Sequence, residues 1–85
     1  MKKMQHDTVR YYIEDAFVEL RKILHGCKNK KLREGDFFPL MEHALEMLNC
    51  AFNCRFISRK KISQMSQKKW EKYLSPPKEI FARQQ

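Results

Sequence analysis

The 85-residue sequence has few of the residues that break helices or favour strands. It contains two glycines and three prolines, and its β-branched residues do not form runs. Sheets and turn-rich folds use more of both kinds of residue, so their scarcity argues against an all-β architecture and favours an all-α one. No stretch approaches the roughly 18 apolar residues of a transmembrane helix.

The sequence also lacks the features of a disulfide-bonded protein and of a signal peptide. The chain has three cysteines, and an odd number cannot form a closed disulfide framework. The N-terminal residues MKKMQHDT are polar from the start and lack the apolar core of a signal peptide. We therefore expect a cytoplasmic protein in a reducing environment.

No complete catalytic or cofactor motif is present. The sequence has no glycine-rich phosphate loop, and none of its three histidines has an evident acid or nucleophile partner. Glu42 and Glu46 lie four residues apart, which is typical of a solvated helix face. The sequence predicts a non-enzymatic protein without a cofactor.

The strongest pattern in the chain is the stretch from Asp36 to Ile57, which predicts a long helix. Its apolar residues cover more than the arc of about 100° that a one-sided surface helix needs. Asp36 is a plausible N-cap, and Pro39 fits within the first turn. We expect this helix to be covered on more than one side.

A second helical pattern runs from Thr8 to His25, with apolar residues three and four positions apart. Gly26 stands where a C-terminal cap is expected. A loop of about ten residues, Gly26 to Asp36, favours an antiparallel hairpin. The predicted fold is a single all-α domain over residues 1–85, a small three- to four-helix bundle built on a hairpin of residues 7–57. Other helices or a dimer would complete the bundle.

The last third of the chain is strongly basic. Residues 55–85 have nine Lys or Arg against two Asp or Glu, whereas residues 1–54 have nine against eight. A weaker amphipathic pattern predicts a basic helix over residues 58–74, as one long helix or as a turn followed by a helix from Ser66. A short C-terminal helix or tail is expected over residues 75–85, because Ser75, Pro76 and Pro77 can end one helix and begin another.

This charge favours a polyanionic partner, either an acidic protein patch or nucleic acid. Aromatic residues lie between the cations, as in proteins that bind phosphates and stack on bases. The candidate binding residues are Arg55, Arg59, Lys60, Lys61, Lys68, Lys69 and Lys72. A solvated basic face is the alternative explanation.

Two sets of side chains on the second predicted helix suggest further roles. The wide apolar arc provides a candidate protein interface at Phe37, Met41, Leu48 and Phe52. Cys50 and Cys54, at i and i+4, are weak candidates for metal ligands, since His43 is too far along the axis to share their ion. A core or interface stripe explains the cysteines better.

These observations predict a small helical interaction module or regulator that binds an acidic protein partner or self-associates as a homodimer. The alternative is a nucleic-acid-binding protein that uses residues 55–72. Counterion release would make nucleic-acid binding fall steeply with salt, whereas an apolar dimer interface would hardly respond.

Overall fold

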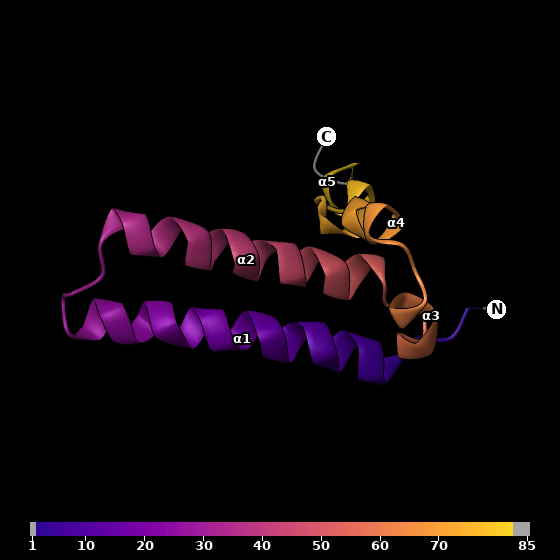
Figure 1. Cartoon of the computed structure of the whole chain (residues 1–85), viewed down its shortest axis with the longest axis horizontal. Helices are drawn as coiled ribbons and strands as arrows, with labels where there is room; N and C mark the ends of the chain where they lie inside the picture. Colours follow the sequence, from indigo (N-terminus) through magenta and orange to yellow (C-terminus); the bar gives the residue numbers. More distant parts are fainter. Residues whose placement is uncertain (1, 83–85) are drawn as a thin grey trace.

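The computed structural model describes residues 2–82, without the side chains of residues 81 and 82. Within that range the chain is all-helical and has no strand. Two long helices, α1 (His6–Lys28) and α2 (Glu34–Asn53), form an antiparallel hairpin (Figure 1). The all-α class and the packed hairpin are confirmed.

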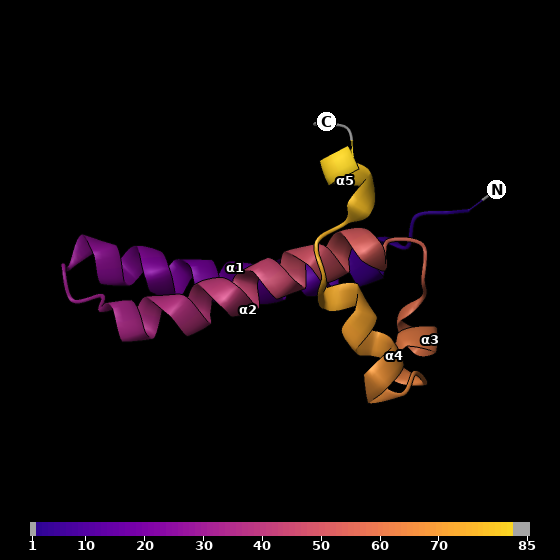
Figure 2. The ribbon, with the colours of Figure 1, turned by 90° about the horizontal axis from the view of Figure 1, so that it is seen from above.

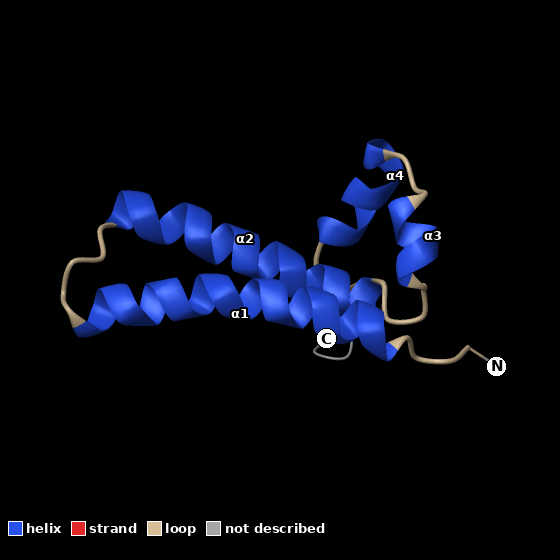
Figure 3. Cartoon of the chain, turned by 60° about the horizontal axis from the view of Figure 1, so that its bottom comes forward, coloured by secondary structure: helices blue, strands red, loops and turns tan. Residues whose placement is uncertain are grey.

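The remaining elements are short and follow the open end of the hairpin. They are α3 (Arg59–Ser63), α4 (Gln67–Glu71), the 3-10 helix η1 (Lys72–Leu74) and α5 (Lys78–Ala82). Figures 2 and 3 show that α3 and α4 lie on one side of the hairpin, and Figure 2 shows α5 projecting to the other side near the C-terminal end of α2.

The prediction that Gly26 caps the first helix is wrong. Helix α1 continues to Lys28, and Asn29 is its C-cap residue. Gly26 instead lies under the loop, where a Cβ atom would be 3.0 Å from the Cβ of Leu32. The glycine is therefore used for a close approach, and Lys30 takes the left-handed conformation with a φ of 57°.

Helix α2 is shifted toward the N-terminus relative to its predicted bounds. It begins at Glu34 rather than Asp36, and neither Arg33 nor any other side chain supplies a cap hydrogen bond there. It ends at Asn53 rather than Ile57, where Cys54 is the C-cap residue. The prediction that Pro39 falls in the first turn is wrong: it is the sixth residue of α2, where the missing amide costs the helix the hydrogen bond to the Gly35 carbonyl.

The basic segment forms two short helices instead of one. The hydroxyl oxygens of Ser58 and Ser66 accept hydrogen bonds from the amides of Lys61 and Lys69, each at 3.2 Å, and so start α3 and α4. A serine that caps a new helix favours extended backbone at its own position, which interrupts the preceding helix. Of the two predicted alternatives for residues 58–74, one long helix is therefore wrong, whereas a helix does begin after Ser66 and is preceded by the short helix α3.

Hydrogen bonds between distant segments hold the short helices against the hairpin. The Thr8 hydroxyl donates to the Ile57 carbonyl at 2.7 Å. The amide nitrogens of Asn49 and Asn53 donate to the carbonyls of Leu74 and Tyr73, at 2.8 and 2.9 Å. Carbonyls that a helix end leaves unpaired thus gain partners from α2.

The main core cluster lies at the open end of the hairpin. Its buried residues come from α1, from α2 and from the cap of α2, and the short helices add half-buried side chains such as Ile62, Trp70 and Leu74. The buried members are Tyr12, Ala16, Met47, Cys50, Ala51 and Cys54. The half of the hairpin near its loop is covered on fewer sides.

Within residues 2–82, no helix combines the length and hydropathy needed to cross a lipid bilayer.

Candidate functional site

An exposed apolar stripe runs along α1. Ile13, Phe17, Leu20 and Leu24 recur at spacings of three and four, so they share one face of the helix. All four are exposed, Phe17 at 57% and Leu24 at 55% of their full surface. The helix buries a different face, which includes Tyr12, Ala16 and Ile23, against α2.

A matching stripe runs along α2. Phe38 and Leu45 are 63% and 53% exposed, Leu48 is also exposed, and Met41 and Phe52 are half-buried. On this helix the buried face includes Ala44, Met47 and Ala51.

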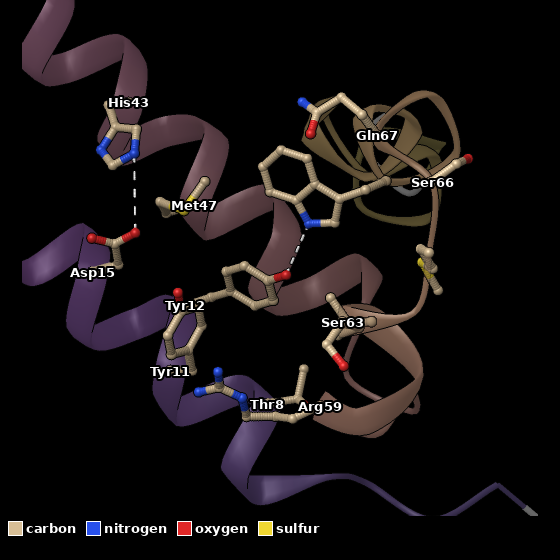
Figure 4. A pocket seen from close by; sticks show the side chains of 13 residues that line it. Thr8, Tyr11, Tyr12, Asp15, His43, Met47, Arg59, Ser63, Ser66 and Gln67 are labelled. Atoms are coloured by element: carbon tan, nitrogen blue, oxygen red, sulfur yellow. Dashed lines mark hydrogen bonds and ion pairs between the residues drawn. The ribbon is translucent and has the colours of Figure 1, made fainter.

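The two stripes lie on the same side of the hairpin. Viewed from the N-terminus of its own helix, each stripe is rotated from the buried face in the same sense. Because the two helices are antiparallel, this rotation brings both stripes to the same side of the hairpin. Asp15 and His43, displaced in the other sense, lie 4.0 Å apart on the side of α3 and α4 (Figure 4). We call the nine residues Ile13, Phe17, Leu20, Leu24, Phe38, Met41, Leu45, Leu48 and Phe52 the apolar face.

Three of the four predicted interface residues belong to this face. Met41, Leu48 and Phe52 lie on it, with Phe52 covered by the guanidinium of Arg55 at 3.9 Å from its ring centre. Phe37 is half-buried beside the face. The α1 half of the face is not among the predicted interface residues, because apolar periodicity alone does not separate its exposed residues from its buried ones. The signal was the width of the α1 apolar arc, which a single neighbouring helix cannot cover.

The seven predicted cationic binding residues are divided between two places. Arg55 lies just after α2 and Arg59 is the first residue of α3, and both stack on aromatic rings, Arg59 at 3.7 Å from the centre of Tyr11. The other five are exposed lysines on α3, α4 and η1 and have no ion-pair partner among residues 2–82: Lys60, Lys61, Lys68, Lys69 and Lys72.

The aromatic residues of the basic segment do not accompany these lysines. Trp70 and Tyr73 pack against the core cluster, and the Trp70 indole N–H donates to the Tyr12 hydroxyl at 2.9 Å. They are therefore not free to stack on bases. Phe56 remains 37% exposed, with Lys2 and Arg55 over its ring.

Cys50 and Cys54 are completely buried in the core cluster. Burial raises the pKa of the Cys50 thiol to about 12 and that of the Cys54 thiol to about 11, so both are neutral at physiological pH. No group of three or more His, Cys, Asp or Glu in the described part of the chain is arranged to hold a metal ion.

A pocket of about 450 Å³ opens on the side of the hairpin opposite the apolar face. Helices α1, α2, α3 and α4 all line it (Figure 4). Its aromatic walls are Tyr11, Tyr12 and Trp70, and its polar groups include Arg59, Ser63, Ser66 and Gln67. The sequence did not reveal this pocket, since its residues are far apart in the chain and Tyr12 and Trp70 fit core positions.

Comparison of the chain with protein-family models, with curated proteins and with solved structures finds no match.

Proposed function

We propose that this protein is a small, non-enzymatic interaction module that self-associates through the apolar face of its hairpin. The observation that carries the proposal is the exposure of apolar side chains along both long helices on one side. Monomeric soluble proteins rarely expose contiguous apolar patches of more than a few hundred Å². A second copy would place its own apolar face on this one and complete a four-helix bundle.

The apolar face has about half the size of a typical interface. Its residues span roughly 20 Å along the two helices, and two helices side by side are roughly 20 Å wide, which gives on the order of 400 Å² in projection. Specific interfaces bury about 800 Å² of accessible surface per partner, and accessible area exceeds projected area. Side chains that border the face would therefore supply part of the interface.

Charges at the edges of the face favour a second copy over an unrelated partner. Arg21 is exposed on the outer edge of α1, with its guanidinium 5.8 Å from the centre of the Phe17 ring. Glu42 is exposed on the outer edge of α2, four residues after Phe38. Stacking α1 of one copy on α2 of the other brings opposite charges together at both edges.

The proposal is tested by Phe17→Glu, with Val18→Glu as a matched control on the same helix. Both side chains are exposed, at 57% and 48%, but Val18 points about 100° away from the apolar face. Phe17→Glu should yield a folded monomer, since the new carboxylate can pair with Arg21 at i+4. Val18→Glu should keep the association. Equal association of both variants in sedimentation experiments would rule out this face.

Nucleic-acid binding is a second candidate function, and the five exposed lysines without ion-pair partners among the described residues favour it. Because Trp70 and Tyr73 are part of the core, such binding would rest on phosphate contacts without base stacking. Changing Lys60, Lys61, Lys68 and Lys69 together to Gln should abolish it and leave self-association unchanged. Binding that survives this change would exclude these lysines as the site.

A further inference from the structure

The pocket on the opposite side of the hairpin has the size and composition of a small-molecule site. Its volume of about 450 Å³ falls within the range of roughly 300 to 1,000 Å³ of ligand pockets. Apolar side chains, among them Met47, Ile62 and Met65, line it together with aromatic rings. It lies where α1, α2, α3 and α4 converge, so residues far apart in the sequence position its walls (Figure 4).

Tyr12 supplies a buried hydrogen-bond donor to this pocket. The residue is only 3% exposed, and its hydroxyl oxygen accepts the hydrogen bond from the indole of Trp70. The proton of the hydroxyl itself has no acceptor among residues 2–82. Burial raises the pKa of Tyr12, which keeps this proton in place. A buried donor without an acceptor favours a ligand that brings one.

Arg59 adds a positive charge to the pocket, and the N–H donors of its guanidinium remain available. The central carbon of its guanidinium lies over the ring of Tyr11, 3.7 Å from the ring centre. Stacking uses the face of the guanidinium and leaves the N–H groups on its edge free. No carboxylate in the described part of the chain forms an ion pair with Arg59, whereas Asp15 on the pocket wall has His43 4.0 Å away.

We propose that this pocket binds a small carboxylate with a flat, apolar body. The carboxylate would accept hydrogen bonds from Arg59 and Tyr12, because a planar guanidinium matches the geometry of a carboxylate. The body would pack against Trp70 and Met47, where aromatic and sulfur-containing side chains favour a ring. The site is independent of the apolar face, which lies on the other side of the hairpin.

Benzoate is the probe for this proposal, and the single tryptophan, Trp70, is the reporter. Titration of benzoate into the full chain should change the Trp70 fluorescence saturably, with a Kd on the order of 1 mM or tighter. Benzyl alcohol, which has a similar body without the charge, should bind at least about tenfold more weakly. The absence of a saturable response to benzoate, or equal binding of both probes, would overturn the proposal.

Arg59→Gln and Lys60→Gln form a matched pair, since both residues are exposed and adjacent but only Arg59 lines the pocket. Arg59→Gln should weaken benzoate binding by about tenfold and leave benzyl alcohol unaffected, whereas Lys60→Gln should bind benzoate like the unchanged protein. Circular dichroism would verify that each variant is folded. Equal losses in the two folded variants would show a general charge effect and contradict the site.

Discussion

Cys50 and Cys54 are the buried residues through which pH should act on the stability of this fold. Both side chains are inaccessible to solvent, and burial is the largest cause of the raised pKa of each thiol. In the unfolded chain a thiol loses its proton near pH 9, whereas the folded values are about 12 and about 11. Between pH 9 and the folded-state pKa values, the folded state binds more protons than the unfolded state. The free energy of unfolding must therefore fall as the pH rises through this range.

We therefore predict that the free energy of unfolding is unaffected by these thiols below about pH 8 and declines above about pH 9, by up to roughly 1.4 kcal/mol per pH unit for each thiol. Urea unfolding at a series of pH values measures this decline. The double variant Cys50→Ala, Cys54→Ala should have a shallower slope over the same range. Equal slopes would show that other groups govern the alkaline stability.

At the scale of helices, the two glycines provide a matched test of how the hairpin is closed. Gly26 lies in α1, where an added Cβ would meet the Cβ of Leu32 at 3.0 Å. Gly35 lies in α2 with nothing within 4 Å of an added Cβ. The amides of Lys31 and Leu32 both donate to the Gly26 carbonyl, which restricts the movement of Leu32.

Alanine should therefore have opposite effects at the two glycines. Gly35→Ala should stabilise the protein by about 0.5 to 1 kcal/mol, because alanine is the better helix former. Gly26→Ala should lose that gain and destabilise the protein, because Leu32 must be displaced. Chemical unfolding of both variants measures these changes in the free energy of unfolding. A similar stabilisation by both would mean that Leu32 does not restrict Gly26.

The long helices could be predicted from the sequence, because apolar periodicity over 20 or so residues reports the helix directly. Their ends could not, since Gly26 marks a close approach to Leu32 in the following segment and not the end of α1. The break between α3 and α4 has a local cause in Ser66, but the same sequence also fits one long helix. Tertiary contacts decide such boundaries.

The candidate sites were predictable to different degrees. Met41, Leu48 and Phe52 could be assigned to an apolar arc, because periodicity shows which residues share a face. The sequence could not show which face the short helices cover, so the exposure of Phe17 and Leu24 was not foreseen. The pocket depends on the contact between Tyr12 and Trp70, which are 58 residues apart in the chain.

At the scale of the whole molecule, the edge charges predict how the two copies of the proposed dimer are oriented. Arg21→Glu or Glu42→Arg alone should weaken self-association several-fold, because each places like charges together. The double variant should regain much of the loss if α1 of one copy lies on α2 of the other. Sedimentation at low salt measures the three affinities. If the double variant self-associates no more tightly than the single variant with the lower affinity, this orientation is contradicted.

The proposed self-association rests on two features, the core cluster at one end of the hairpin and the exposed apolar face. Sedimentation equilibrium of the unmodified chain, from about 1 to 200 μM, tests this claim most directly. We predict a mass that approaches twice the 10.4 kDa of one chain and changes little with added salt. A mass of 10.4 kDa throughout would contradict self-association through the apolar face.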